Sequence, residues 1–393
     1  MQAILVLNAG SSSIKFAAYE HAAPTREPVL LARGRIAKAG LETEMLVRRA
    51  DGEVLEQSRA PGGARFDHDR AMARLFDWLA AHRVGLVLAA IGHRVVHGGS
   101  RYRAPVRVDD AVLSDLDALA PLAPLHQPHN LAPIRHLRAR LPDVPQVACF
   151  DTAFHATQPA VATRIALPRE VTDAGVRRYG FHGLSYEYIA SRLPAVLGDA
   201  ACGRVVVAHL GNGASLCAMR DGRSVGSSMG FSALDGLVMG TRSGALDPGV
   251  VLYLIEQRGM SAAEVGTMLY ERSGLLGVSG IGSDMRVLLA SADAHAKEAV
   301  ELFVYRLVGE IGRSIATMGG IDSLVFTAGI GENSAEIRTR VCASFDWCGV
   351  AIDPDANARN ASTIHAAGSR VRVAVVPTDE ERMIAIHTAR CCA

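Results

Sequence analysis

The segment LVLNAGSSSIKF, residues 5–16, decides how the rest of the chain is interpreted. Apolar and β-branched residues at 4–7 and 14–16 flank small or polar residues, which predicts a strand, a tight connection and a returning strand. A loop of Asn8, Gly10 and serines 11, 12 and 13 lets backbone N–H groups and hydroxyls approach an anion closely, and Lys15 adds a positive charge. The alternative is an ordinary turn rich in glycine and serine, and the spacing is not that of a Walker loop.

A second hairpin of the same kind begins at Arg204, where the sequence is RVVVAHLGNGASLCAMRDGRSVG. It predicts strands over 205–208 and 215–219, a loop over 209–214 and a turn at Asp221-Gly222. The two halves of the chain therefore begin alike.

A third loop of small residues, at the end of SLVFTAGIGENS (323–334), follows a predicted strand over 323–327 and precedes a helix from Ala335. Its glycines suit close approach of a nucleotide, although a GxG alone is a weak signal, and Asn333 alternatively caps the helix. The preceding segment, 293–318, carries one apolar helix face and ends at Gly319-Gly320. Residues 21–65 predict either a meander or a poorly packed excursion, without a function. The alternation of strands and helices predicts an α/β protein.

Composition limits the possible functions. A chain of 393 residues with 49% hydrophobic content predicts two or three domains. Lys and Arg number 41 against 40 Asp and Glu, so the net charge of +1 offers no broad basic face for nucleic acid. We expect no signal peptide and no membrane span, since no apolar run approaches about 18 residues. Seven scattered cysteines without a CxxC pair argue against disulfides or zinc and favour a cytoplasmic protein.

Several segments are dense in residue types that carry chemistry. They are IGHRVVHGG (91–99), LAPLHQPHN (122–130), CFDTAFH (149–155), RRYGFHGLSYEY (177–188), MGTRSGALDPG (239–249) and SGIGSDMR (279–286). A metal hydrolase is disfavoured, because there is no HExxH motif and arginines among the candidate ligands would repel a cation. Arg94, Arg242 and the glycine-rich loops suit a phosphate instead, because guanidinium groups and backbone donors match phosphoryl oxygens.

The duplicated openings resemble those of the actin, hexokinase and Hsp70 superfamily. Within it, nine motifs are similar in order and spacing to those of the acetate kinase (acetokinase) family: NAGSSSIK, GHRVVHGG, DTAFH, RYGFHG, HLGNGAS, MGTRSG, SDMR, FTAGIGENS and PTDEE. The resemblance implies an α/β fold of duplicated actin/hexokinase-like (ribonuclease H-like) domains with an active-site cleft between them. The expected domains are 1–151 plus 382–393, on the acyl substrate side, and 152–381, which binds nucleotide.

The resemblance implies reversible transfer of the γ-phosphoryl group of ATP to acetate, which gives acetyl phosphate and ADP. Arg94 would hold the substrate carboxylate, Arg242 would stabilise the transferred group, and His182 would donate a hydrogen bond to it. Asp151 would align an arginine or the magnesium shell, because a carboxylate ionised at pH 7 gives a base no proton to take. For each of these residues the alternative is a buried ion pair at a domain edge.

Further residues follow from the matched motifs. The acyl pocket would be walled by Val96, Leu125 and Phe181, with His126 either a ligand or a loop clasp. Asn8 and Glu380 would contact Mg²⁺ or Mn²⁺. The phosphates of ATP or ADP would lie against Lys15 and the loop His209, Leu210, Gly211, Asn212 and Gly213. Adenosine would be enclosed by Asp284, Met285, Arg286, Gly329, Ile330, Gly331, Glu332 and Asn333.

The sequence departs from the family pattern at three places. Leu184-Ser185-Tyr186 replaces the usual T-S-H, so donor roles at those positions do not carry over, and Asp379 replaces the usual asparagine beside Glu380. Ala233 stands where a proline is usual, which enlarges the acyl pocket, while the bulky Val96 favours acetate. The alternatives are therefore a propionate or butyrate kinase of the same fold, or a non-catalytic nucleotide switch. By resemblance the protein is a homodimer joined through helices of its second domain.

Overall fold

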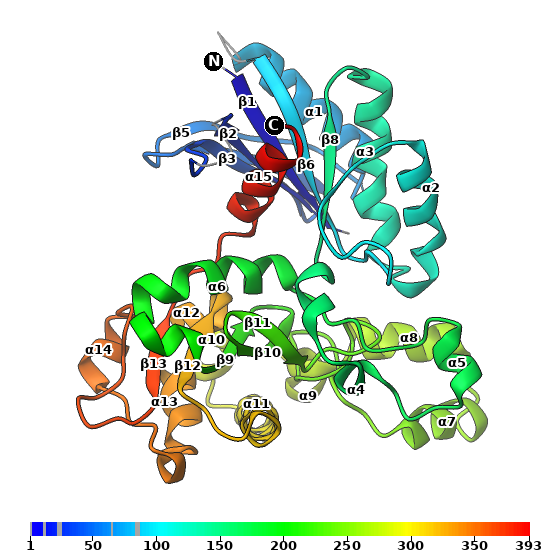
Figure 1. Ribbon diagram of the computed structural model, residues 1–393. Coiled ribbons are helices and arrows are strands. Elements are labelled where there is room, and N and C mark those ends of the chain that lie inside the picture. Colours follow the sequence, from blue (N-terminus) through cyan, green and yellow to red (C-terminus); the bar gives the residue numbers. More distant parts are fainter. Residues whose placement is uncertain (1, 11–12, 22–25, 64–65, 83–86) are drawn as a thin grey trace. The chain divides into compact units, whose positions relative to one another are not determined.

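The computed structural model describes residues 2–10, 13–21, 26–63, 66–82 and 87–393 (Figure 1). Serines 11 and 12 of the first loop lie outside the described residues. The chain divides into two compact units, Met1–Phe154 with Asp379–Ala393, and His155–Thr378. The expected domain boundaries, after residues 151 and 381, stay a prediction. No helix in the described ranges combines the length and the apolar content that a membrane crossing requires.

The first unit is built on an eight-stranded sheet in the order β5-β4-β3-β2-β1-β6-β8-β7. β1 to β5 form an antiparallel meander, and β3 to β5 confirm the meander as the alternative that holds for residues 21–65. β6 lies parallel to β1 and β8 parallel to β6. Ala9 pairs with Ile14, which confirms the hairpin predicted from residues 5–16. The strands are β1 (Gln2–Ala9), β2 (Ser13–Glu20), β3 (Leu30–Ala39), β4 (Glu42–Arg49), β5 (Val54–Pro61), β6 (Val87–Val95), β7 (Val106–Arg107) and β8 (Gln146–Phe150).

Helices cover both faces of this sheet. α1 (His68–His82) and α3 (Gln127–Arg140), with α2 (Asp110–Ala118) beside α3, cover the face to which Leu7 of β1 and Ile91 of β6 point. α15 (Glu380–Cys391) lies against the other face of β1 and β6. A methyl group added at Gly92 of β6 would lie 2.3 Å from Oγ1 of Thr388 in α15, so a glycine is required for this close packing.

The second unit repeats the strand pattern of the first. Its five-stranded sheet has the order β11-β10-β9-β12-β13, which matches β3-β2-β1-β6-β8 in both sequence order and strand direction. The turn after β10 has φ of 52° at Asp221 and 68° at Gly222, which confirms the predicted hairpin turn. The strands are β9 (Arg204–Leu210), β10 (Ala214–Arg220), β11 (Arg223–Ser227), β12 (Ser323–Thr327) and β13 (Arg372–Val375).

The helices of the second unit include the predicted apolar one, α11 (Ala294–Met318), which buries Val300, Phe303, Leu307 and Ile311 and ends at Gly319 with φ of 71°. The glycine-rich segment after β12 is a helix, α12 (Ala328–Asn333), so the loop predicted there is wrong. The remaining helices are α4 (Ala160–Thr163), α5 (Arg169–Asp173), α6 (Gly183–Leu197), α7 (Pro248–Glu256), α8 (Ala262–Glu271), α9 (Gly274–Ser279), α10 (Met285–Ala290), α13 (Ala335–Ala343) and α14 (Pro354–Ala358). Short 3-10 helices lie at Ala120–Leu122, Ala153–Thr157, Gly198–Cys202 and Asp346–Cys348.

Candidate active site

A first cluster of polar residues lies on the face of the first unit's sheet that α15 covers. Side chains alternate between the two faces of a strand, and Leu7 points to the opposite core. Asn8 on β1 and Lys15, its partner on β2, therefore share the α15 face. Arg94 shares this face too, because it lies two residues beyond Gly92 on β6. The alternation of the strands thus gathers these three side chains.

The guanidinium of Arg94 is held by Asp151, the residue that follows β8. Nε donates to Oδ1 at 3.0 Å and NH2 donates to Oδ2 at 2.5 Å, so the ion pair is bidentate. NH1 donates to Oδ1 of Asn8 at 3.2 Å. A guanidinium has five N–H groups. Counting the described residues, one N–H on NH1 and one on NH2 remain for a ligand at the terminal edge of Arg94.

Burial makes the electrostatics of this cluster strong. Burial acts to lower the pKa of Arg94, but the carboxylates of Asp151 and Glu380 outweigh it and raise that pKa above its ordinary value. Glu380 opens α15, and burial raises the pKa of Glu380 to about 7 from its ordinary value of 4.5. Asp151 and Glu381 add to this rise, while Arg94 and Lys15 oppose it. The cluster therefore favours an additional positive charge.

Two buried amide side chains of α3 hold the strand ends of this cluster, and sequence reasoning missed both. Asn130 accepts from the backbone N–H of Val96 at 2.8 Å and donates to the carbonyl of Ala9 at 2.6 Å. Gln127 accepts from the N–H of His97 and donates to its carbonyl. The segment LAPLHQPHN contains both residues. Both share one helix face with the apolar residues Leu131 and Ile134, and this spacing is the signal in the sequence.

In the second unit, two stacked imidazoles form a second cluster. His182 precedes α6 in the left-handed conformation, with φ of 58°, and its ring lies 4.2 Å from that of His209, centroid to centroid. Oγ of Ser215 lies 2.8 Å from Nδ1 of His182, and Oγ of Ser185 lies 2.8 Å from Nδ1 of His209. His209 and Ser215 are directly paired across β9 and β10. The second hairpin and α6 thus fix both rings.

Arg242 and His182 converge on the loop of the second hairpin. A methyl group built on Gly213 would lie 3.2 Å from Nε2 of His182 and 3.8 Å from NH1 of Arg242. NH1 of Arg242 also donates to the carbonyl of Ala233 at 3.0 Å. Gly274, with φ of 64°, comes so close that an added methyl would lie 2.6 Å from the carbonyl oxygen of Arg242. The arginine is therefore held at both its backbone and its guanidinium.

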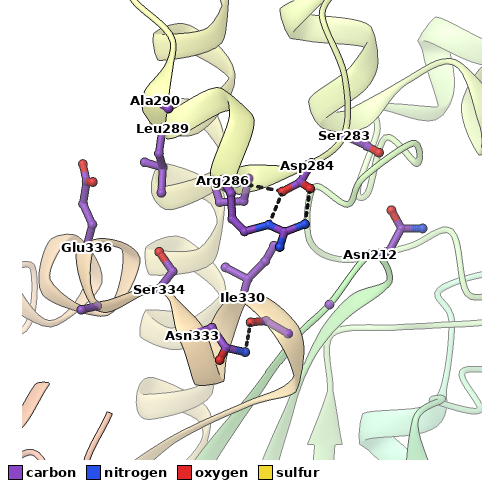
Figure 2. A pocket seen from close by; sticks show the side chains of 14 residues that line it. Asn212, Ser283, Asp284, Arg286, Leu289, Ala290, Ile330, Asn333, Ser334 and Glu336 are labelled. Carbon is purple, nitrogen blue, oxygen red and sulfur yellow. Dashed lines mark hydrogen bonds and ion pairs between the residues drawn. The ribbon is translucent and has the colours of Figure 1, made fainter. Parts of the chain in front are cut away.

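A pocket of about 770 Å³ lies beside this loop in the second unit (Figure 2). Eight of the residues predicted to bind the nucleotide line it: Gly211, Asn212, Asp284, Met285, Arg286, Gly329, Ile330 and Asn333. Sequence reasoning missed six others: Ser283, Leu289, Ala290, Ser334, Ala335 and Glu336. The missed residues lie on α10, just before it and at the start of α13, so only the fold reveals that they share one pocket with the predicted ones.

Asp284 and Arg286 form a closed pair at the rim of the pocket, as the dashed lines in Figure 2 show. Nε and NH2 of Arg286 donate to the two oxygens of Asp284 at 3.0 and 2.6 Å, and the Arg286 backbone N–H donates at 2.9 Å. These hydrogen bonds lower the pKa of Asp284 to about 2. The carboxylate is thus engaged as the cap of α10, and Arg286 is the exposed member of the pair.

Asn333 does not cap the helix that follows it, so that alternative is wrong. Its amide donates to the carbonyl of Gly329 at 2.9 Å, within α12. The cap of α13 is Ser334, whose hydroxyl accepts from the N–H of Ile337. The amide of Asn333 thus secures α12 beside the pocket.

Glu332 ties the end of β12 to the end of β13. One of its oxygens accepts from the N–H of Ala328 at 2.8 Å and from the N–H of Thr378 at 3.1 Å. Ala328 has φ of 63°, which is strained for a residue with a side chain. Neither Glu332 nor Gly331 lines the pocket, and Gly331 is buried. The observed contacts of Glu332 are therefore with the backbone.

Arg338 supports the same helix from the core, and sequence reasoning missed it. Its side chain is fully buried, and burial lowers the pKa of its guanidinium. NH1 donates to the carbonyls of Gly331 and Glu332 at 2.8 and 3.0 Å. Nε and NH2 donate to Asn357 and Asn360. All these partners are neutral oxygen atoms, so this arginine links α12, α13 and α14 without an ion pair.

The predicted acyl and phosphate residues are distributed over both units. Val96, Leu125 and His126 belong to the first unit, and Phe181 to the second. Val96 and Phe181 are 4% and 2% exposed, whereas Leu125 is 42% exposed. His126 lies at the N-terminus of α3, and Leu210 is buried in β9. Their roles stay predictions.

The donor set was tested for a divalent metal. Among the described residues, no group of three or more His, Cys, Asp or Glu side chains is arranged to hold a metal ion. Glu380 nonetheless fits one, because a cation would offset the desolvation of its carboxylate. Oδ1 of Asn8 already accepts from Arg94, so it has one lone pair left. These residues fit Mg²⁺ or Mn²⁺ provided that phosphate oxygens and water complete the shell.

Comparison with known proteins gives the family. The model of the acetokinase family matches residues 3–386. An acetate kinase of Rhodopseudomonas palustris is 56% identical over 98% of both chains. An acetate kinase of Rhizobium meliloti is 51% identical over 99% of this chain and 98% of its own.

Solved structures agree. A propionate kinase from Francisella tularensis has a TM-score of 0.90 and 37% identity, and covers 99% of this chain and all of its own. The acetate kinase of Porphyromonas gingivalis has a TM-score of 0.88 and 36% identity, with both chains fully covered. These matches cover almost the whole chain, and their sequence identities are high enough to show a shared family and not just a shared fold. The chain therefore belongs to the acetokinase family.

Proposed function

We propose that this protein catalyses the reversible phosphorylation of acetate by ATP to give acetyl phosphate and ADP, by direct in-line transfer. The observation that carries the proposal is the guanidinium of Arg94, which Asp151 holds so that two N–H groups remain at its terminal edge. Two parallel N–H donors match the two oxygens of a carboxylate. Full-length relatives named acetate kinase support acetate as the substrate.

The acyl half of the reaction requires positioning rather than proton removal. Acetate is ionised near neutral pH and is therefore already the nucleophile. Both oxygens of Asp151 accept hydrogen bonds from Arg94, so this carboxylate acts on the orientation of the arginine. Holding a nucleophile in the correct geometry lowers the barrier by avoiding the entropy loss of encounter.

The phosphoryl half requires donors around the group in transfer. Negative charge is spread over its three equatorial oxygens, and fixed donors stabilise that charge. His182 and Arg242 are such donors, since both approach the loop glycine Gly213, which has no side chain to keep a phosphate away. The nucleotide that supplies the group would occupy the pocket beside this loop, with Ile330 and Leu289 as apolar contacts for its base. Lys15 would contribute a further positive charge from the first unit.

Replacement of either arginine tests the mechanism. We expect Arg94→Ala and Arg242→Ala to lower kcat by about 10²- to 10³-fold, the usual effect of losing one donor to developing charge. Lysine at either position restores little, because it has no planar fork. The readout is acyl hydroxamate formed from acetate, ATP and hydroxylamine.

The matched control is Arg223→Ala, which removes an exposed arginine of the second unit. Its kcat should equal that of the unaltered protein. Full activity in Arg94→Ala or Arg242→Ala would contradict the proposal. Nucleotide binding without any acyl phosphate would favour the switch alternative.

Glu380 is the residue that we propose as the principal protein ligand of Mg²⁺, with Asn8 as a second. The ion supplies neutralisation of the phosphoryl oxygens when it is bound. Asp379, the neighbour of Glu380, is engaged elsewhere: its carboxylate caps α15 through the N–H of Arg382 at 3.0 Å and accepts from Tyr19. The aspartate at this position therefore acts on the helix, and its charge is shared with Arg33.

The raised pKa of Glu380 gives a prediction for stability without metal. The folded protein keeps this proton up to about pH 7, whereas the unfolded chain loses it near 4.5. Stability therefore falls as the pH rises from 4.5 to 7. In EDTA, Glu380→Gln should raise the thermal midpoint at pH 8 and change it little at pH 5. The exposed Glu298→Gln is the control, and an equal effect at both pH values would contradict the prediction.

Propionate is the second candidate substrate, and Ala233 is the observation that favours it. The backbone carbonyl of Ala233 accepts from Arg242, so this residue lies at the transfer site of the second unit. An alanine without the ring of the usual proline leaves space for a longer acyl chain. One methylene changes discrimination by about 1–3 kcal/mol.

The acyl series decides between the two substrates. We expect kcat/KM in the hydroxamate assay to be highest for acetate, within about tenfold of that for propionate, and lowest for butyrate. Ala233→Pro should lower the propionate-to-acetate ratio, because the ring fills the added space while the carbonyl is retained. Ala233→Gly should not lower it. A ratio unchanged by proline would show that this position does not limit chain length.

We propose further that two copies of the chain associate through α7. Apolar side chains on and beside this helix are exposed by 36–56%, and none of its residues is buried. They are Leu246, Val250, Leu252, Tyr253 and Ile255. Exposed apolar faces of this kind are typical of association surfaces.

A cytoplasmic location is proposed as well, since all seven cysteines are free thiols, as expected in a reducing compartment.

Light scattering after gel filtration tests the dimer. We expect the unaltered protein to have twice the 41.6 kDa mass of the chain. Leu252→Glu combined with Tyr253→Glu should give the monomer mass, because buried charges oppose association. Trp347→Glu, at a residue 67% exposed outside α7, is the control and should remain dimeric. A monomeric unaltered protein would refute the proposal.

A further inference from the structure

The hydroxyl of Tyr186 and the ring of His182 meet at the same serine. Tyr186 lies in the first turn of α6, four residues after His182, which precedes the helix. The Tyr186 hydroxyl lies 2.5 Å from Oγ of Ser215, and Nδ1 of His182 lies 2.8 Å from the same oxygen. Ser215 therefore bridges the phenol and the imidazole.

The phenol keeps its proton and has one place to direct it. Tyr186 is fully buried, and burial raises its pKa well above the ordinary value of 10. Within the described part of the chain, its oxygen hydrogen-bonds to Oγ of Ser215, and the backbone N–H of His209 acts on it only by lowering its pKa. A backbone N–H only donates. The phenolic proton is therefore directed to Ser215.

The direction of the phenolic proton determines where the hydroxyl proton of Ser215 points. The hydroxyl of Ser215 accepts from Tyr186 and, among the described residues, has Nδ1 of His182 as its other side-chain partner. With Tyr186 donating to Oγ, the arrangement that also gives the seryl proton an acceptor within this trio directs it to Nδ1, which is then unprotonated. A neutral imidazole with an unprotonated Nδ1 carries its proton on Nε2.

We infer that Tyr186, acting through Ser215, is a positioning residue that holds His182 in the tautomer with its proton on Nε2. The inference rests on the proposed role of His182 as a donor to the transferred phosphoryl group. Nε2 is the atom on the side of Gly213, 3.2 Å from a methyl built there. A protonated Nε2 donates to a phosphoryl oxygen, whereas the other tautomer would direct a lone pair at it.

Tyrosine suits this task better than the histidine that the family usually carries at position 186. An imidazole donates or accepts according to its own tautomer, so a histidine leaves the direction of the relay open. A buried phenol always has a proton to donate near neutral pH. Tyr186 therefore makes the direction of the two hydrogen bonds unique.

The tautomer itself is the first readout. In protein labelled with ¹⁵N at histidine, the ring nitrogens of His182 are assigned by their disappearance in His182→Gln. We expect a protonated Nε2 and an unprotonated Nδ1 in the unaltered protein, and a mixture of tautomers in Tyr186→Phe and in Ser215→Ala. In both variants kcat should fall about tenfold, while KM for acetate and for ATP stays within about twofold, because substrate-binding groups remain.

Tyr188→Phe is the matched control, since it removes a phenol from the same helix outside the relay. Its His182 resonances and kcat should match those of the unaltered protein. An unprotonated Nε2 in the unaltered protein would overturn the inference, and this measurement needs no variant of Tyr186 to fold. An unchanged tautomer and kcat in Tyr186→Phe would overturn it as well. Full activity of His182→Ala, which removes the donor, would instead refute the proposed donor role of His182, and the spectrum tests the tautomer separately.

Discussion

The desolvated ion pair between Arg94 and Asp151 is the constraint on which the first unit's cluster depends. A buried charge is costly unless it is paired, so the two residues fix each other's position at the ends of β6 and β8. Asn8 completes the arrangement from β1, which lies beside β6 in the sheet. Gly92 matters for the same reason, because it lets α15 approach closely enough to bring Glu380 to the cluster.

In the second unit, uncharged hydroxyl groups fix the positions of the two imidazoles. Its imidazoles are fixed by hydroxyls, Ser215 for His182 and Ser185 for His209, and the latter serine is backed by Thr378. Neutral hydrogen bonds avoid the desolvation of full charges. The two units share a strand order and thus offer the same positions for polar residues at the strand ends. Different types of side chain occupy these positions in the two units.

Local sequence patterns predicted most of the fold. The features that they did not predict depend on contacts between residues far apart in the sequence. The hairpins at 5–16 and 205–219 and the apolar face of α11 were readable because strand and helix periods leave signatures within a few residues. The loop predicted over 328–333 is a helix because buried Arg338 binds its carbonyls from outside the segment. Asn130 and Ser215 were missed for a similar reason. Their side-chain partners lie 29 residues or more away along the chain, and no spacing reveals them.

The backbone of Ala328 has a consequence for Gly329 and Ile330, which follow it in α12 and line the pocket. A left-handed alanine costs about 1–3 kcal/mol, and a hydrogen bond to a charged group returns about 1.5–3 kcal/mol. The N–H of Ala328 donates such a bond to the carboxylate of Glu332. The cost of the left-handed conformation and the gain from the hydrogen bond are thus nearly equal at this residue. The carboxylate of Glu332 holds the strained backbone of Ala328 in place. Loss of this hydrogen bond would make α12 the most easily deformed part of the pocket lining.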